Sequence, residues 1–438
     1  MAERSLRGIR KNQYFLPVNG VQSASPSALP APLAATARLS WTQVVLAAVL
    51  MVATLPGRTQ GLGLITEPVL ADLSLDRVTY ANMNLWGTLL GALVCLPTGW
   101  AIDRFGLRSV TTVVLFALGF TVWRFSLLTA NIAAIFGLLL ATRAFGQSAL
   151  SVCSITTVAR WFPNRAGFAM GVYSVLLSIF FAMAFGAIGF SIRSGGWRSA
   201  WMQIALVLVA IIAPITIFSL RPPPQSSMIK AETNPRTADG LTLAEALRTR
   251  AFWIFAGTAA AFNMVSSGLG LFNEAVLNER GFDQKTFHLF LAFSTLLSLA
   301  GQMACGWLTR RYRYQTLTFV ALVTYALGLG LIPVITQRWQ LFGLAVLAGV
   351  AGGMIIVIFF SVWSDLFGQR HLGRIQGVAQ MLTVFSSGIG PLLFAKCAAI
   401  YNSYAPLLWT LAGLALLLSL LARIVPTPDK QNPVSSVS

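Results

Sequence analysis

Long apolar runs are the feature of this sequence that most restricts its fold. Most of them continue for about 20 residues with few charged side chains, which is the length an α-helix needs to cross the hydrocarbon core of a bilayer. Of the 438 residues, 56% are hydrophobic and 10% are charged, and this composition excludes a soluble globular fold. A membrane β-barrel would alternate apolar and polar residues in runs of about ten. The sequence therefore predicts an all-α integral membrane protein.

The apolar runs predict twelve transmembrane helices in two groups of six. The longest interruption, residues 221–250, separates an N-terminal six-helix bundle at 41–220 from a C-terminal six-helix bundle at 251–425. Residues 1–40 are basic and then rich in Ser, Ala and Pro, which predicts a disordered tail, and residues 426–438 form a second tail. The expected spans are about 42–70, 80–102, 109–129, 132–159, 167–190, 199–219, 251–277, 286–309, 316–335, 341–365, 373–399 and 404–424.

The interruption at 221–250 combines signals that break a helix with signals that start one. Three prolines follow Arg221, and proline cannot continue a helix. Near the end of the interruption, Thr242 and Glu245 have the spacing of a capping box. We predict a disordered stretch that leads into a short amphipathic surface helix, with a regulatory binding loop as the alternative.

The positive charges indicate the orientation of the chain. An even number of spans places both tails on one side of the membrane, and Lys and Arg are more frequent in the tails, in 221–250 and in the loops of that side. By the positive-inside rule, both termini and the middle loop are predicted to be cytoplasmic, in a plasma or inner cell membrane. The net charge of +18 is therefore a topology signal, and we expect no nucleic-acid partner.

A short charged segment, residues 99–108, separates the second and third spans. Asp103, Arg104 and Arg108 would each cost several kcal/mol in lipid, so the segment is predicted to be a cytoplasmic turn. Gly99 permits close approach of another helix. The Asp103 carboxylate, at a helix end, can accept N–H bonds from the start of a neighbouring helix.

The same segment carries a resemblance to a known family. It follows the pattern G-x-x-x-D-R-x-G-x-R of the loop between helices two and three in the major facilitator superfamily, through Gly99, Asp103, Arg104, Gly106 and Arg108. The resemblance extends over about residues 40 to 425. It implies two pseudo-symmetric six-helix bundles that rock about a solute site near the membrane midplane, with these five residues as the cytoplasmic gate motif.

Two patterns recur in the two halves of the chain. The matched positions are Gly99 with Gly306, Asp103-Arg104 with Arg310-Arg311, Gly167 with Gly373, and Gly171 with Gly377. Each pair occupies the same place in its half, which predicts a duplicated unit. Gly306, Arg310 and Arg311 are then the second-half counterpart of the gate.

Polar residues at membrane depth are the candidates for binding the solute. A side chain of this kind must face a partner or a watery cavity, which makes each one a functional hypothesis. In the family that the chain resembles, spans one, four, seven and ten line the central cavity. The substrate-binding candidates are Arg58, Thr59, Gln60, Arg143, Gln147, Asn263, Asn273 and Lys396, and the coupling candidates, towards the outer face, are Glu67 and Glu274.

Arg58 and Arg143 indicate that the solute is an anion. Both guanidiniums stay charged at physiological pH, and no Asp or Glu lies at their depth in the sequence. Because two uncompensated charges in a low-dielectric cavity are costly, a bound anion is the expected partner. Two alternatives stay open: backbone carbonyls and water can satisfy one or both arginines, and Arg143 can clamp onto carbonyls of the first span.

The segment from Pro56 to Gly63 also allows two interpretations. It contains one proline and three glycines. These residues can break the first helix in the middle of the membrane and free carbonyls towards a cavity, or the glycines can form a close-packing face.

Three further segments resemble one branch of the superfamily, that of monocarboxylate porters and oxalate–formate exchangers. They are Pro56-Gly57-x-Thr59, Arg143, and Arg160-Trp161-Phe162 before Gly167 and Gly171. The resemblance implies secondary active transport of a small organic anion such as a monocarboxylate, by alternating access, with a coupling proton or a counter-solute. The alternatives are efflux or uptake of a neutral or amphiphilic solute, and a transport-inactive receptor on the same fold.

Other function classes find no support in the sequence. The four cysteines lie in apolar runs without a C-x-x-C pair, which predicts packing residues and no metal site. No G-x-x-x-x-G-K-[ST] loop or catalytic constellation occurs, so we expect no ATP, no cofactor and no enzymatic activity. The expected partners are a small solute and the lipid bilayer, and the chain is expected to be a monomer.

Overall fold

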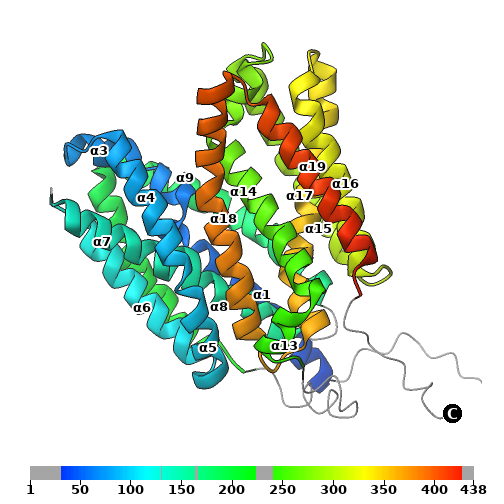
Figure 1. Cartoon of the computed structure of the whole chain (residues 1–438). Coiled ribbons are helices and arrows are strands. Elements are labelled where there is room, and N and C mark those ends of the chain that lie inside the picture. The colour runs from blue at the N-terminus through cyan, green and yellow to red at the C-terminus, as the bar shows by residue number, and fades with distance from the viewer. Residues whose placement is uncertain (1–30, 130, 163–165, 223–239, 427–438) are drawn as a thin grey trace, which may run out of the picture. The chain divides into compact units, whose positions relative to one another are not determined.

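The computed structural model describes residues 31–129, 131–162, 166–222 and 240–426. The chain divides into two compact units, Met1–Leu39 and Ser40–Ser438. Within the described residues, the second unit is built from helices and contains no strand. Its helices gather in an N-terminal and a C-terminal bundle, which Figure 1 shows in blue to green and in green to red.

Each bundle contains six spans, some of them made of several helical segments. The first bundle consists of α1 (Ala31–Val52), η1 (Leu55–Gly57), α2 (Thr59–Gly63), α3 (Thr66–Asp72), α4 (Arg77–Ala92), α5 (Cys95–Phe105), α6 (Leu107–Ser126), α7 (Ile132–Thr142), η2 (Arg143–Leu150), α8 (Ser151–Trp161), α9 (Ala166–Leu206), η3 (Val207–Ile212) and α10 (Ala213–Ser219). The short α13 (Leu243–Arg248) precedes the second bundle. That bundle consists of α14 (Arg250–Asn278), α15 (Gln284–Leu308), α16 (Tyr314–Leu331), η4 (Ile332–Val334), α17 (Arg338–Phe367), α18 (Leu372–Tyr401) and α19 (Ala405–Ile424).

Twelve transmembrane spans are present in the described ranges, as predicted. Eleven helical stretches are long and apolar enough to cross a membrane, and one of them, Ala166–Ser219, has 54 residues. Gly196 interrupts this stretch with a left-handed backbone (φ 75°), which glycine adopts without a Cβ clash. The parts before and after Gly196 are the fifth and sixth spans. Across the turn, the Ser191 hydroxyl donates a hydrogen bond to the Gln203 side chain (2.9 Å).

The first helix begins earlier than the hydropathy of the sequence indicated. The expected start was near residue 42, whereas α1 begins at Ala31. Alanine recurs through residues 31–37, and alanine has the highest helix propensity of all residues. Pro32, Thr36 and Arg38 offset the hydropathy of these alanines, so the apolar run was placed too far along the chain.

The first span is broken near its middle, at the segment for which two interpretations were open. α1 ends at Val52, a single 3-10 turn contains Pro56, and Arg58 has an extended backbone (φ −93°, ψ 153°) before α2 begins. Gly57 is also closely packed, since a methyl group on it would overlap the Thr142 carbonyl oxygen. The helix therefore breaks, as the first interpretation predicted, and a glycine lets the fourth span approach the break, as the second predicted. The Gly57 carbonyl accepts from Arg143, which does not line the cavity described below.

The fourth span contains a π-helical segment, η2, that the sequence pattern did not indicate. It begins at Arg143 and includes Gly146, which packs against Gly57 with its Cβ position 3.0 Å from the Gly57 Cα. The wider turn changes which side chains of this span face the first span. This matters for Arg143, because the direction of its side chain decides what it can bind.

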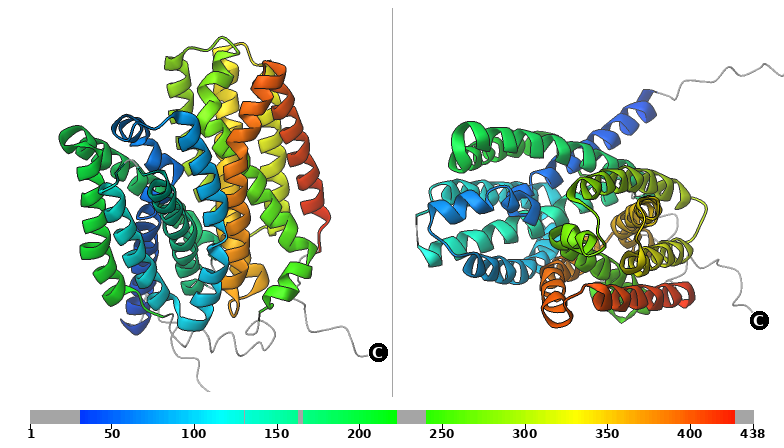
Figure 2. Two further views of the ribbon diagram at one scale, coloured as in Figure 1. Left: turned by 60° about the vertical axis from the view of Figure 1, so that its left-hand side comes forward. Right: turned by 90° about the horizontal axis from the view of Figure 1, so that it is seen from above.

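Glycine pairs join the two bundles at one end of the molecule. Gly99 on α5 meets Gly373 on α18 so closely that a methyl group on Gly99 would overlap the Gly373 carbonyl. Gly306 on α15 meets Gly171 on α9 in the same manner, with its Cβ position 3.2 Å from the Gly171 Cα. The recurring sequence patterns thus correspond to two equivalent helix crossings between the bundles. This end, which also contains Asp103, is called the Asp103 end below; Figure 2 shows the bundles from two further sides.

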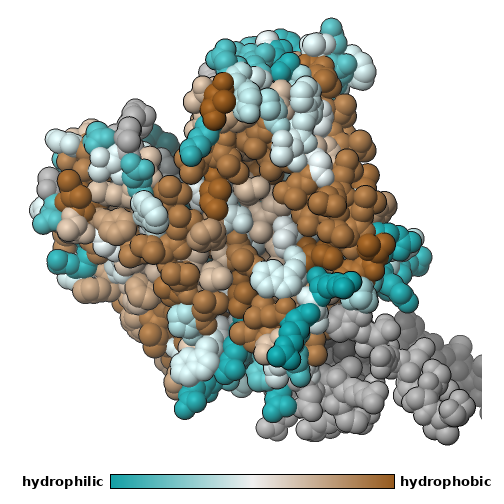
Figure 3. Space-filling view, in the orientation of Figure 1, coloured by the Kyte–Doolittle hydropathy of each residue, from teal (hydrophilic) through white to brown (hydrophobic). Residues whose placement is uncertain are grey.

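The outer surface of the bundles matches a lipid environment. Many large hydrophobic side chains are exposed, among them Val113 at 67%, Phe190 at 67% and Phe218 at 76%. In Figure 3, hydrophobic residues cover most of the visible face and hydrophilic residues gather towards its upper and lower ends. Apolar side chains lose nothing by facing acyl chains, so this pattern is that of a multi-pass membrane protein.

The short helix predicted before the second bundle is α13. The Thr242 backbone N–H donates to Glu245 Oε2 (2.8 Å), and the Glu245 N–H donates to Thr242 Oγ1 (3.3 Å), which completes the predicted capping box. The Leu241 N–H donates to the carbonyl of Phe367, so α13 begins beside the end of α17. Residues 223–239, for which disorder was predicted, lie outside the described ranges.

Candidate functional site

A cavity of about 520 Å³ lies between the two bundles. Its walls come from spans one, four and five on one side and from spans seven, eight, ten and eleven on the other. Spans one, four, seven and ten were expected to line such a cavity, and the structure adds the other three. The polar side chains of the lining are Arg58, Ser174, Ser178, Asn263, Thr295, Gln302, Gln380 and Thr383.

Arg58 reaches the cavity from the break in the first span. Its Nε donates to Thr54 Oγ1 (2.6 Å), and one terminal nitrogen donates to Ser151 Oγ (3.0 Å) and contacts the Met51 sulfur (2.8 Å). Its guanidinium carbon lies 5.8 Å from the centre of the Phe181 ring. All of these partners are neutral, so the positive charge of Arg58 is not compensated by an ion pair among the described side chains.

Arg143 is 2% exposed and is held by four neutral oxygen atoms. One terminal nitrogen donates to Asn84 Oδ1 (2.8 Å), and the other donates to Gln147 Oε1 (2.8 Å), Thr59 Oγ1 (3.0 Å) and the Gly57 carbonyl (3.3 Å). This Arg143 cluster ties the fourth span to the first and second. The clamp interpretation of Arg143 therefore describes its geometry, and Thr59 and Gln147 belong to the clamp.

The other predicted binding residues are spread over several places. Asn263 lines the cavity, and its amide donates to the Ala259 carbonyl (2.9 Å). Gln60 on α2 is exposed, and Asn273 on α14 is half-buried. Lys396 is exposed on α18 and is not among the residues that line the cavity. Glu67 and Glu274 lie on α3 and α14, but their side chains are outside the described part of the chain.

Several lining residues were missed by the sequence interpretation. Gln302 is 4% exposed and donates to Ser298 Oγ (3.3 Å), while its Oε1 has no hydrogen-bond partner among the described residues. Gln380 and Thr383 contribute from α18, and Asn84 contributes to the Arg143 cluster. Each is a polar side chain inside an apolar run, the same signal that selected Gln60 and Gln147. The signal was thus present but was applied mainly to spans one, four and seven.

Asp103 is the centre of the contacts at the Asp103 end. Its side chain is 5% exposed; Oδ1 accepts from Arg160 (2.8 Å) and from the Gly373 N–H (3.1 Å), and Oδ2 accepts from the Arg374 N–H (3.0 Å). These two amides begin α18, so the carboxylate lies at the positive end of that helix dipole. The predicted contact with a helix start is present, and the structure adds the ion pair with Arg160.

Further polar contacts hold the bundles together nearby. The Thr156 hydroxyl donates to Gln376 Oε1 (2.8 Å), and the Gln369 amide donates to the Ala159 carbonyl (2.8 Å). Both connect α8 to the α17–α18 region of the other bundle. The cavity is therefore separated from the Asp103 end by packed and hydrogen-bonded helices.

The remaining motif residues shape the turn after Asp103. Gly106 has φ 84° and ends α5, a backbone conformation in which a side chain would be strained. Arg104 and Arg108 are exposed, and the Arg104 guanidinium lies 5.6 Å from the Trp100 ring centre. They act at the surface of this end and take no part in the Asp103 contacts.

The second-half counterpart repeats the packing but reverses the charge. Arg310 occupies the position that corresponds to Asp103, and its guanidinium lies 4.2 Å from the Phe168 ring centre near the start of α9. Arg311 lies 5.1 Å from the Trp307 ring centre. The first crossing is thus fixed by a buried carboxylate at a helix start, and the second by a cation–π contact.

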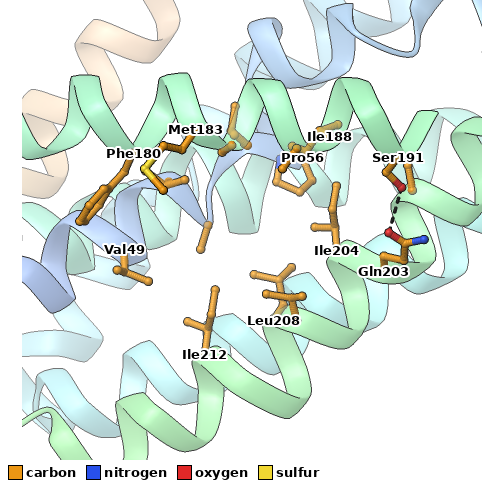
Figure 4. A pocket seen from close by; sticks show the side chains of 17 residues that line it. Val49, Pro56, Phe180, Met183, Ile188, Ser191, Gln203, Ile204, Leu208 and Ile212 are labelled. Atoms are coloured by element: carbon orange, nitrogen blue, oxygen red, sulfur yellow. Dashed lines mark hydrogen bonds between the residues drawn. The ribbon is translucent and has the colours of Figure 1, made fainter. Parts of the chain in front are cut away.

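A second cavity, of about 410 Å³, lies within the first bundle (Figure 4). It is bordered by the break of the first span, by α9 and by η3, with Pro56, Phe180 and Ile204 among its walls. Ser191 and Gln203, which bond to each other, are its polar residues. None of its described lining residues is charged, which makes the cavity between the bundles the better site for a charged solute.

Within the described ranges, no group of three or more His, Cys, Asp or Glu side chains is arranged to hold a metal ion. The four cysteines are free thiols and buried, as their positions in apolar runs predicted.

These features define a multi-pass helical membrane protein with a cavity, lined by an arginine, between two six-helix bundles. A family model described as Major Facilitator Superfamily matches residues 46–327 and 270–438. The chain belongs to this superfamily. It is a transmembrane transporter, and proteins of this family carry small solutes.

Individual proteins show the same relationship. The oxalate:formate antiporter of Oxalobacter formigenes is 24% identical over 359 residues, which are 80% of this chain and 84% of that protein, and it fits the predicted branch. The proton:xylose symporter XylE, solved with 6-bromo-6-deoxy-D-glucose, has a TM-score of 0.64 at 13% identity over 90% of this chain and 97% of its own. The human organic anion transporter MFSD10 has a TM-score of 0.62 at 17% identity, over 88% and 99%.

Proposed function

We propose that the protein transports an organic anion by alternating access, and that the anion binds Arg58 in the cavity between the bundles. The observation that carries this proposal is the position of Arg58, which lines the cavity with a positive charge and only neutral partners. The oxalate:formate antiporter and the organic anion transporter MFSD10, by their names, act on anions, which is consistent with the proposal.

The physical argument concerns the cost of an isolated charge. A guanidinium in a low-dielectric site loses much of its hydration free energy, and hydrogen bonds to neutral oxygens compensate for only part of that loss. A carboxylate compensates for more of it, because it accepts two parallel N–H bonds from one guanidinium and neutralises its charge. Asn263 and Gln380 offer amide donors on the opposite wall, where they can bind further oxygens of the same solute.

Arg143 acts, in this proposal, by positioning and not by binding the solute. It fixes Gly57 and Thr59 on either side of Arg58, so the extended backbone at the break is held against the fourth span. Losing the Arg143 cluster would let this backbone move, and the Arg58 guanidinium would move with it. A second cation for the anion is therefore not required.

The Asp103 end is proposed to be the cytoplasmic gate. Its loops carry most of the basic residues, and the positive-inside rule assigns that side, together with both termini, to the cytoplasm of the cell membrane. The cavity can open to this side only if Asp103 separates from the start of α18 in the other bundle. This helix-start contact would thus break and re-form once in each cycle, whereas the Asp103–Arg160 ion pair lies within the first bundle.

The charge preference can be tested by thermal stability of the purified protein. A ligand that binds only the folded state raises the melting temperature, in proportion to the logarithm of its concentration over its Kd. The protein would be screened against matched carboxylates, uncharged amides and sugars, and ammonium compounds. We expect stabilisation by carboxylates that is lost in Arg58→Gln and kept in Arg124→Gln, an exposed arginine on α6. Stabilisation by sugars or cations alone would contradict the proposal.

A further inference from the structure

The cavity between the bundles has an aromatic lining beside its single charge. Five phenylalanines face it, two from α9, one from α14 and two from α17: Phe181, Phe185, Phe262, Phe359 and Phe360. Isoleucine and leucine side chains fill much of the remaining wall. A solute that touches these surfaces gains by burying apolar area of its own.

Neighbouring rings hold these phenylalanines in place. Phe181 stacks on Phe185 with ring centres 6.1 Å apart, and Phe262 lies 5.4 Å from Tyr325. Phe360 makes an edge-to-face contact with the buried Tyr173, with ring centres 5.6 Å apart. Because the rings are already fixed by these contacts, binding a solute costs little additional side-chain ordering.

The cavity supplies one positive charge. Among its described lining residues Arg58 alone is charged, and Arg143 is occupied by its own cluster outside the cavity. A solute with two carboxylates could pair only one of them. The second would lie among rings and amides, where an unpaired charge is strongly disfavoured.

The volume also selects against the smallest anions. A cavity of about 520 Å³ falls in the range of roughly 300–1,000 Å³ typical of sites for drug-sized ligands. A two-carbon carboxylate bound at Arg58 would leave most of the apolar wall without a partner. The second cavity, in Figure 4, is of similar size but has no charge, so it lacks the anchor.

We infer that the solute is a monoanion with an aromatic or similarly large apolar body, whose carboxylate binds Arg58 and whose ring packs on Phe181. This inference rests on the proposed anion transport and names the class of anion. Phe181 is the specificity-determining residue, because its ring is the one that the Arg58 guanidinium already contacts.

The experiment compares four ligands that differ in one property each. Isothermal titration of the purified full-length protein would use benzoate, benzamide, terephthalate and acetate. Benzamide removes the charge, terephthalate adds a second charge, and acetate removes the ring. We expect benzoate to bind at least tenfold more tightly than each of the other three.

Two substitutions connect the preference to its residues. Phe181→Leu keeps an apolar side chain and should weaken benzoate roughly two- to tenfold while leaving acetate unchanged. Phe190→Leu, on the same helix but 67% exposed, should change neither. Arg58→Gln should weaken benzoate roughly ten- to hundredfold and bring it level with benzamide.

The outcomes separate this inference from the proposal beneath it. If acetate or terephthalate binds as tightly as benzoate and all three exceed benzamide, anion recognition stands and the aromatic monoanion is wrong. If benzamide equals benzoate in the wild type, the anion proposal itself is wrong. Failure of all four to bind would also overturn the inference, since benzoate has both features that it requires.

Discussion

Replacing Asp103 by Asn should open the Asp103 end. Asn has nearly the same shape, but it loses the charge and one of the two acceptor oxygens that bind Arg160 and the start of α18. A hydrogen bond to a charged group contributes about 1.5–3 kcal/mol, and a carboxylate at a helix start contributes about 0.3–1 kcal/mol more. We therefore expect the closed arrangement to lose about 2–4 kcal/mol, which shifts the closed-to-open ratio roughly 30- to 700-fold.

Pulsed double electron–electron resonance, which measures the distance between two spin labels, reports this shift directly. Spin labels at Arg108→Cys on α6 and Arg313→Cys before α16 would report the distance between the bundles at this end, since both positions are exposed. The native cysteines are buried and would be replaced by alanine or left unlabelled. In Asp103→Asn the distance distribution should move to longer values, while ligand binding stays near that of the wild type because Asp103 does not line the cavity.

Asp72→Asn is the matched control. Asp72 pairs with Arg198 at 2.9 Å, but both residues belong to the first bundle and both side chains are at least 40% exposed. Exposed pairs contribute little to stability, so this variant should leave the distance distribution unchanged. An unchanged distribution in Asp103→Asn, or the same change in both variants, would refute the gate reasoning.

Three further predictions concern the Arg143 cluster, the Gly99–Gly373 crossing and the cap of α13. Arg143→Lys should destabilise the protein by about 2–4 kcal/mol in thermal unfolding, because an ammonium group cannot reach both Asn84 and Gln147; a loss equal to that of an exposed Arg→Lys change would contradict the clamp. Gly99→Ala should lengthen the same inter-label distance through its overlap with Gly373, whereas Gly137→Ala, which meets nothing within 4 Å, should not. Hydrogen bonds from Thr242 lower the pKa of Glu245, so α13 should keep its amide protection above about pH 4.3 and lose it as the pH falls further. Protection that is independent of pH would contradict this capping account.

The spans themselves could be predicted because hydropathy and length determine them. Each span must satisfy its own backbone in lipid, and only a helix of about 20 residues does so, whatever its neighbours are. The Asp103 contact was predictable for a similar reason: a carboxylate that ends one helix and a duplicated glycine pattern leave few places for it to bind. The start of α1 at Ala31 was missed, because Pro32, Thr36 and Arg38 lower the hydropathy of a segment whose alanines favour a helix.

The direction of each intramembrane side chain could not be predicted. Arg58 and Arg143 lie at comparable depth in the sequence, yet Arg58 lines the cavity and Arg143 does not. The depth of a residue in the membrane follows from its position along the helix, but the side to which its side chain points depends on the rotation of the helix about its axis. The break at Pro56 and the π-helical turn at Arg143 both alter that rotation. Lys396 is a further example: it lies within the span formed by α18, but its side chain is exposed and does not line the cavity.

Which polar residues line the cavity depends on both bundles together. Gln302 and Gln380 belong to spans eight and eleven, and they become lining residues because those helices cross the first bundle at Gly306 and Gly373. The glycine patterns were visible in the sequence, but the pairing of one glycine with another was not. A contact between distant segments therefore determined which amides face the solute.

The central claim, that an anion is carried through Arg58, is tested most directly by counterflow in proteoliposomes. Vesicles loaded with unlabelled benzoate would be diluted into radiolabelled benzoate, and label would be followed for the wild type, Arg58→Gln and the exposed-arginine control Arg124→Gln. We predict saturable accumulation in the wild type and the control, and a rate reduced roughly ten- to hundredfold in Arg58→Gln at subsaturating benzoate. Equal rates in all three proteins, with all three correctly inserted, would contradict the account.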